Sequence, residues 1–65
     1  MQIVLNGKPF EIKENATVGD LLQELDLQGK LAVEINREII PRSTFRSRPI
    51  RAGDEIEIVH AIGGG

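Results

Sequence analysis

In the first twelve residues, apolar side chains suited to a core stand at every second position, with one interruption. Ile3 and Leu5, and later Phe10 and Ile12, stand at every second position, which is the period expected of β-strands. Asn6-Gly7 separates the two runs, and this dipeptide tolerates the positive φ angles that a two-residue turn requires. The pattern therefore predicts an antiparallel hairpin.

After the hairpin, the spacing of apolar residues changes from two to three and four. The residues with this spacing are Val18, Leu21, Leu22 and Leu25. Thr17 precedes them, and its hydroxyl can accept a hydrogen bond from a free amide of the first turn, where Asp20 is also favoured. We expect a helix of about 9 to 11 residues with one apolar stripe. Gly29 is predicted to be its C-terminal cap.

The second half of the chain returns to a period of two. Leu31, Val33 and Ile35 stand at alternate positions and predict a third strand. Residues 38–40 follow the turn at Asn36-Arg37 and predict a short return strand, which Pro41 ends.

A polar connection leads from the return strand to the last strand. Residues 41–49 are rich in arginine and are expected to run over the surface, with one helical turn near residues 43–46. Residues 52–54 mark a turn, and residues 55–58 alternate into a final strand. The predicted element order is ββαββ.

One amphipathic helix can bury its own stripe and two hairpins only when the strands form a single sheet against it. The element order fits the β-grasp arrangement, in which the last strand lies parallel to the first at the centre of the sheet. We expect an α+β fold, a mixed sheet packed on one main helix, as a single domain over residues 1–65. Residues 62–65 are expected to form a flexible C-terminal tail.

The size of the chain disfavours catalysis. A domain of 65 residues buries only about 60% of the surface that its unfolded form exposes, and this leaves little room for a cleft lined by converging catalytic side chains. We therefore expect a binding or carrying function, with no catalytic residues of its own.

Composition excludes several kinds of site. The chain has no cysteine, so it has no disulfide framework and no thiolate zinc site, and the lone His60 lacks partners for a metal or a triad. A net charge of −2 and only two aromatic residues disfavour nucleic acid as a partner. There is no basic leader and no uncharged run approaching the roughly 18 residues that span a membrane. We expect a cytoplasmic protein that does not bind membranes.

Three glycines end the chain after an apolar strand, and they allow two interpretations. They form either a frayed tail without a function or a thin stalk that carries the α-carboxylate of Gly65 into a narrow channel. That carboxylate is ionised at neutral pH. It can attack the α-phosphorus of ATP without help from a side chain, and the product would be an acyl-adenylate.

Several short segments carry a family resemblance. They are Met1-Gln2-Ile3, Asn6-Gly7, Thr17-Val18, Leu21-Leu22, residues 33–42 (VEINREIIPR), Gly53-Asp54, residues 56–59 (IEIV) and Gly64-Gly65. In order, spacing and total length they resemble the ThiS sulfur carriers of thiamin biosynthesis, relatives of MoaD and ubiquitin. The resemblance spans nearly the whole chain and is specific because the segments occur together.

The resemblance implies a ubiquitin-like β-grasp fold and a protein cosubstrate rather than an enzyme. A ThiF-like adenylating enzyme of the ubiquitin-activating type would use ATP to adenylate Gly65, and sulfur from a persulfide donor would replace AMP to leave a thiocarboxylate. A ThiG-like thiazole synthase would then take the sulfur. Gly64 matches the family's Gly-Gly terminus together with Gly65, and Gly63 extends the stalk that threads the partner's site. No cofactor would be bound by the chain itself.

Other functions remain open at this point. A MoaD-like carrier for the molybdenum cofactor shares the chemistry, although 65 residues is short for one. A β-grasp interaction module, or a modifier joined to lysines, shares the fold. Rescue of thiamin dependence or of molybdoenzyme activity would distinguish the two carriers, and higher-mass conjugates would reveal a modifier.

The arginines are the first candidate partner contacts. All five fall in residues 37–51 and, with Glu38, give this segment a charge of +4, while the segments before and after it each carry −3. The segment is either a solvated loop or a docking site that meets an acidic surface through Arg42 and Arg46.

Apolar residues supply the other candidate contacts. Phe45 stands in the polar connection, where its ring either fills the end of the core or contacts a partner. Val59, Ala61 and Ile62 lie beside the tail. Alternate ones would complete the core, and the others, Ile62 among them, would form an exposed contact patch.

Overall fold

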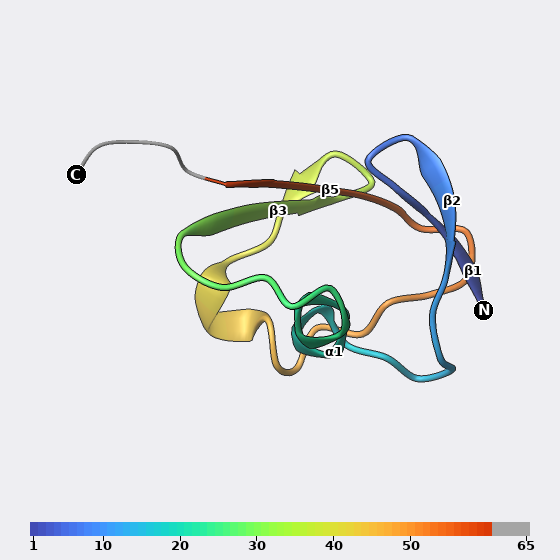
Figure 1. Ribbon diagram of the computed structural model, residues 1–65, viewed down its shortest axis with the longest axis horizontal. Helices are drawn as coiled ribbons and strands as arrows, with labels where there is room; N and C mark the ends of the chain where they lie inside the picture. The colour runs from blue at the N-terminus through green and yellow to red at the C-terminus, as the bar shows by residue number, and fades with distance from the viewer. Residues whose placement is uncertain (61–65) are drawn as a thin grey trace.

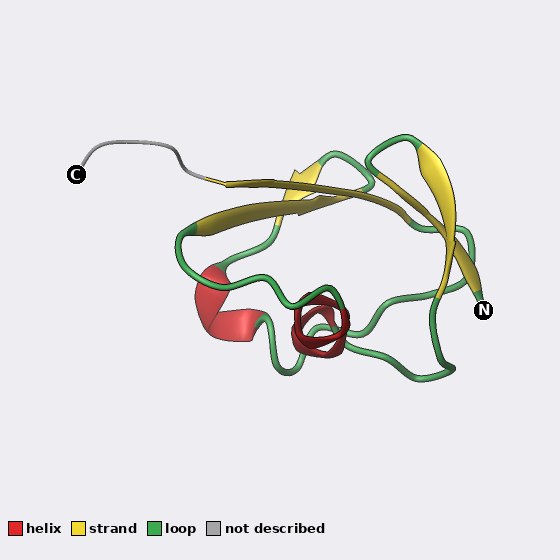
Figure 2. Cartoon of the chain, viewed as in Figure 1, coloured by secondary structure: helices red, strands yellow, loops and turns green. Residues whose placement is uncertain are grey.

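A five-stranded mixed sheet packs on one main helix. The computed structural model describes residues 1–60, and the strands follow the order β2-β1-β5-β3-β4 across the sheet. The elements are β1 (Gln2–Leu5), β2 (Lys8–Glu11), α1 (Val18–Glu24), β3 (Leu31–Ile35), β4 (Glu38–Ile39), the 3-10 turn η1 (Arg42–Thr44) and β5 (Glu55–His60). Helix α1 and η1 lie on the same side of the sheet (Figure 1, Figure 2).

The sheet is antiparallel except at its centre. There β1 runs parallel to β5, with Val4 opposite Glu55 and Leu5 opposite Ile56. β2 pairs antiparallel with β1, and β3 pairs antiparallel with both β4 and β5. The predicted α+β fold, with the last strand parallel to the first, is confirmed.

Both hairpins turn through residues with positive φ. In the first hairpin φ is 49° at Asn6 and 82° at Gly7, and in the second it is 50° at Asn36 and 71° at Arg37. Two successive positive φ angles give the turn a twist that matches the twist of the flanking strands. The predicted hairpin at Asn6-Gly7 and the return strand after Asn36-Arg37 are therefore both present.

The core lies between the sheet and the helix side of the molecule. Its buried side chains are Ile3, Ile12, Ala16, Val18, Leu21, Val33, Ile35, Ile40, Phe45, Ile50, Ile56 and Ile58. Alternate residues of β1, β3 and β5 point into this layer, as the period of two predicts. Phe45 is only 9% exposed and belongs to the core cluster. The prediction that its ring fills the end of the core is confirmed.

The start of α1 follows the prediction. The amide of Asp20 donates to Thr17 Oγ1 at 3.2 Å, and the amide of Thr17 donates to Asp20 Oδ2 at 2.9 Å, so the two residues form a reciprocal capping box. The next free amides are paired as well, because Val18 donates to the carbonyl of Arg48 and Gly19 to that of Phe45. The segment that follows η1 therefore supplies hydrogen-bond acceptors for the first amides of α1.

The end of α1 differs from the prediction. The helix has seven residues, and its left-handed cap is Asp26, with φ of 55°, instead of Gly29. The amide of Asp26 donates to the carbonyl of Gln23, and that of Leu27 to that of Leu22, which is a Schellman arrangement. Aspartate tolerates this conformation, and the early stop lets Leu27 pack against the core.

The capping box makes stability depend on pH in the acid range. The hydrogen bond from the Thr17 amide lowers the pKa of Asp20 below its ordinary value, and the Lys13 ammonium acts in the same direction. Because this pKa is lower in the folded state, the contribution of Asp20 is present at neutral pH. It is lost as the pH falls below about 4, through the folded pKa.

We expect urea midpoints measured from pH 6 down to pH 2 to fall in the native chain and to fall less in Asp20→Asn. The asparagine oxygen still accepts the bond from Thr17 but does not titrate. Equal losses in the two proteins would show that other carboxylates account for the acid sensitivity.

Candidate functional site

The strand that leads to the glycine tail ends beside β3. β5 pairs with β3 as far as His60 opposite Leu31, and His60 is exposed. The predicted carrier residue Gly65, the stalk residues Gly63 and Gly64, and the candidate contact Ile62 lie outside the described residues. Five residues reach at most about 18 Å when fully extended. An enzyme that acts on the terminal carboxylate must therefore bind close to this end of β5.

The sheet surface that faces away from α1 is partly apolar. Strand pairing places Ala32 beside Val59, and Glu34 between Glu57 and Ile39. Ile39 is 73% and Val59 58% exposed. We call the outward-facing residues of β3, β4 and β5 the outer face; they are Ala32, Glu34, Ile39, Glu55, Glu57 and Val59, all exposed except the half-buried Glu34. Ile39 and Val59 lie on this same surface, with β3 between their strands, and they are its candidate apolar contacts.

The outer face is acidic next to its apolar part. A hollow of about 360 Å³ lies near the two hairpin turns, and Glu34, Glu55 and Glu57 line it together with Arg37. Three carboxylates against one guanidinium favour a basic group on a partner. No group of three or more potential metal ligands was found within residues 1–60.

The arginine-rich connection lies on the other side of the sheet, with η1 (Figure 1). Arg42 Nη2 donates to the carbonyl of Gly29 at 2.8 Å, which ties η1 to the loop before β3. Arg48 Nη1 lies 3.9 Å from Glu38 Oε1. Arg46 is exposed. Arg42 and Arg48 therefore have partners within the chain, and a docking role for Arg42 and Arg46 stays a prediction.

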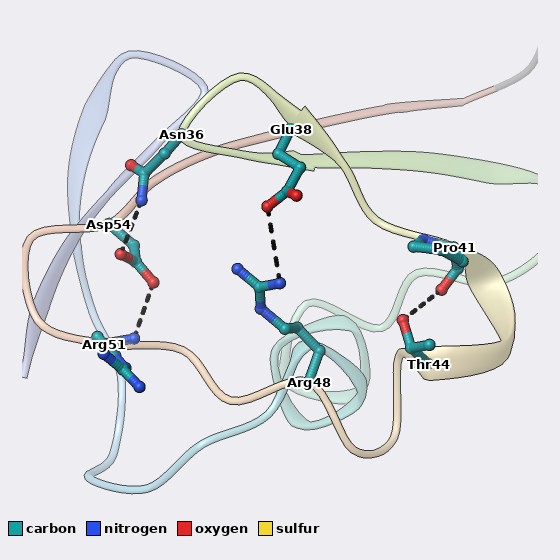
Figure 3. A network of polar contacts seen from close by, with 7 residues as sticks. All are labelled: Asn36, Glu38, Pro41, Thr44, Arg48, Arg51 and Asp54. Atoms are coloured by element: carbon teal, nitrogen blue, oxygen red, sulfur yellow. Dashed lines mark hydrogen bonds and ion pairs between the residues drawn. The ribbon is translucent and has the colours of Figure 1, made fainter.

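A polar network holds the connection in place (Figure 3). The amide of Arg51 donates to Asp54 Oδ2 at 2.8 Å, and Asn36 Nδ2 donates to Asp54 Oδ1 at 3.1 Å. Thr44 Oγ1 donates to the carbonyl of Pro41, the N-cap of η1, at 2.7 Å. The bond between Asn36 and Asp54 joins the second hairpin turn to the residue before β5, so it supports β5 at the end opposite to the tail.

The family model described as the ThiS family matches residues 3–65. The chain belongs to the ThiS family. The match covers both the β-grasp domain and the terminal glycines, which are the two features that the sequence singles out. It also agrees with the resemblance drawn from the short motifs.

Curated relatives and a solved structure agree with this family. The chain is 35% identical to the sulfur carrier protein ThiS of Escherichia coli, over all of both chains, and 41% identical to that of Bacillus subtilis, over 94% of this chain and 96% of the relative. The crystal structure of the thiamine biosynthesis protein ThiS from Geobacter metallireducens superposes with a TM-score of 0.87 at 32% identity, over the whole of both chains.

Some ThiS-family domains are parts of longer proteins. The thiazole synthase of Paramagnetospirillum magneticum is 42% identical to this chain over its full length, but the chain spans only 20% of that protein. The thiazole synthase of Magnetococcus marinus shows the same coverage at 39% identity. A ThiS-type domain and a thiazole synthase therefore occur within one polypeptide in these two proteins.

Sequence reasoning placed Val59 among the residues that would either complete the core or form an exposed patch, and the structure shows it exposed; the rest of the outer face was not identified. One signal for this exposure was available, because Val59 stands out of phase with the buried Ile56 and Ile58 and must point to the opposite surface. The outward orientation of Ile39 could not be predicted from the sequence in this way. Its place on the outer face depends on pairing with Glu34, and the adjacent Ile40 is equally apolar but buried. Within residues 1–60, no helix is long and apolar enough to cross a bilayer.

Proposed function

We propose that this protein is a sulfur carrier for thiazole formation in thiamin biosynthesis. The observation that supports the proposal most strongly is the end-to-end match to the Escherichia coli sulfur carrier protein ThiS, together with a family match that extends to Gly65. The proposed role is that of a cosubstrate, whose C-terminal carboxylate is altered by other proteins. The molybdenum cofactor alternative receives no support from these relatives.

The proposed chemistry uses only the α-carboxylate of Gly65. This group attacks the α-phosphorus of ATP in an adenylating enzyme of the ubiquitin-activating type, and pyrophosphate leaves. The terminal sulfur of a persulfide then attacks the acyl carbon and AMP leaves. A thiol reduces the resulting acyl disulfide to the thiocarboxylate, and thiazole synthase consumes the sulfur. ATP is bound by the partner, and the proposed location is the cytoplasm, where ATP is supplied.

We place the partner contact on the outer face instead of on the arginine-rich connection. Ile39 and Val59 are the large apolar side chains that are exposed among residues 1–60, and Val59 lies next to the strand end from which the tail leaves. The neighbouring carboxylates favour a partner surface with an apolar centre and basic groups around it.

The test of the function is a mass measurement. The protein is incubated with ATP, its adenylating enzyme and a persulfide donor, treated with iodoacetamide, and analysed as intact protein and as a C-terminal fragment. Because the chain has no cysteine, alkylation localised to Gly65 establishes a thiocarboxylate. An unmodified terminus in the presence of active enzyme and donor would reject the carrier function and favour a β-grasp interaction module.

The outer face leads to a separate prediction. Ile39→Lys and Val59→Lys each remove an exposed apolar contact and bring a positive charge towards a basic surface, so each is expected to raise the KM of the adenylating enzyme for this protein by about tenfold or more. The value of kcat should not change, because the tail is intact. Arg46→Glu is the matched control, since it alters an exposed charge on the other side of the sheet. If only Arg46→Glu raises KM, the arginine segment is the docking site.

A further inference from the structure

The two edges of β5 are paired to different lengths. On one edge the main chain of β3 continues to pair as far as His60. On the other edge the main chain of β1 ends at the first hairpin turn, and its last bond is from the Asn6 amide to the carbonyl of Ile56, at 2.8 Å. The second half of β5 therefore has no main-chain partner from β1.

The side chain of Asn6 replaces the missing strand at Ile58. Asn6 Oδ1 accepts the Ile58 amide at 2.8 Å, and Asn6 Nδ2 donates to the Ile58 carbonyl at 3.3 Å. Ile58 is only 7% exposed, so these two main-chain groups would otherwise be left without a good partner, which is costly for a buried peptide. One carboxamide thus extends the ladder by one position towards the tail.

Few residue types can perform both tasks of Asn6. Its φ of 49° is a left-handed conformation that glycine, asparagine and aspartate tolerate best. Its side chain must also offer one acceptor and one donor to a peptide group, which a carboxamide does and a carboxylate does not. Glycine keeps the turn and loses both bonds, whereas aspartate keeps the turn and only the acceptor.

We propose that Asn6 is a positioning residue for the sulfur-transfer chemistry, because it fixes the end of β5 from which the carboxylate-bearing tail leaves. The inference rests on the proposed function. An enzyme that acts on the C-terminal carboxylate must hold it in one position, and the free-energy cost of doing so is smaller when the preceding residues of β5 are already fixed. Loss of the Asn6 side chain should therefore weaken productive docking without altering the reacting group.

Asn36 provides a matched control from the other hairpin. Its φ is 50°, and its Oδ1 accepts the amide of Glu55 at 3.0 Å, while its Nδ2 donates to Asp54 (Figure 3). It supports β5 in a similar way, but at the first residue of the strand. Asn36→Gly removes comparable bonds at the end that is remote from the tail.

The experiment compares Asn6→Gly with Asn36→Gly, since glycine keeps the left-handed turn in both. Hydrogen exchange of the Ile58 amide and the KM and kcat of the adenylating enzyme are measured for each. For Asn6→Gly we expect exchange at Ile58 and KM to rise by about tenfold each, with kcat at saturation unchanged. For Asn36→Gly we expect both quantities to stay near the values of the native chain. Asn6→Asp, which keeps the acceptor, should lie between the two and serves as the second variant if Asn6→Gly does not fold.

Two results would overturn the positioning role. One is an equal rise of KM in Asn6→Gly and Asn36→Gly, which would indicate general destabilisation. The other is a native KM in Asn6→Gly despite faster exchange at Ile58. Failure of the native chain to form a thiocarboxylate would instead reject the proposed function, and the inference with it, so the two failures are distinguishable.

Discussion

Leu21→Ala is expected to remove about 3 kcal/mol or more of the free energy of unfolding, because the substitution deletes buried methyl groups and leaves a cavity. Leu21 has no exposed surface, and only one other residue of α1, Val18, is buried to the same extent. A domain of this size has a total stability of roughly 3 to 10 kcal/mol. The variant should therefore be largely unfolded or close to it at 37 °C.

Urea denaturation followed by circular dichroism measures this loss, and two substitutions provide controls. Leu21→Met preserves most of the volume and should cost less than about 1.5 kcal/mol. Leu22→Ala changes the neighbouring, half-buried position and should cost less than Leu21→Ala. If all three variants had the same midpoint, the packing of α1 on the sheet would not be the main source of stability.

Deletion of Gly65 is expected to reduce thiocarboxylate formation at least about 100-fold, because a displacement of even 1 Å at a reacting atom can have an effect of this size. Since residues 63–65 are all glycine, removing any one of them gives the same chain. That chain still ends in Gly-Gly and has a maximum reach shorter by about 3.5 Å. The deletion therefore tests tail length separately from the identity of the last residue.

The control for this prediction is Gly63→Ala, which keeps both the length and the terminal Gly-Gly. We expect this variant to retain most of the thiocarboxylate formation. The urea midpoints of both variants should match that of the native chain, because the described core ends before the tail. Charging of the shortened chain at the native rate would mean that the position of the carboxylate relative to the domain is not what the adenylating enzyme requires.

Local patterns predicted most of the fold because they have local causes. The alternation around Ile3 and Ile56 determines which surface of a strand is buried, and the Asn6-Gly7 turn and the Thr17-Asp20 cap are formed by neighbouring residues. The parallel pairing of the first and last strands followed from these elements, since a single helix covers one sheet. The end of α1 was missed because both Asp26 and Gly29 tolerate positive φ, and only the packing of Leu27 distinguishes them.

The candidate site was less accessible to such reasoning. Gly65 emerged from the tail and the family resemblance, and its role stays a prediction. The arginines were assessed as free charges, but Arg42 finds its acceptor only when the loop at Gly29 folds against η1. The outer face and the Asn6–Ile58 bonds join residues far apart in the sequence, so they depend on strand register, which composition and spacing do not determine.

The parallel pairing of β1 and β5 has a practical consequence for binding assays. Because the two strands start at the same end of the sheet, the N-terminus and the last residues of β5 lie at opposite ends of the sheet (Figure 1). The Met1 ammonium donates to the carbonyl of Ile12 at 2.6 Å, and a peptide amide in its place still donates one hydrogen bond. A fluorophore or an immobilisation linker attached ahead of Met1 is therefore expected to leave unobstructed the end of β5 for which we propose sulfur transfer.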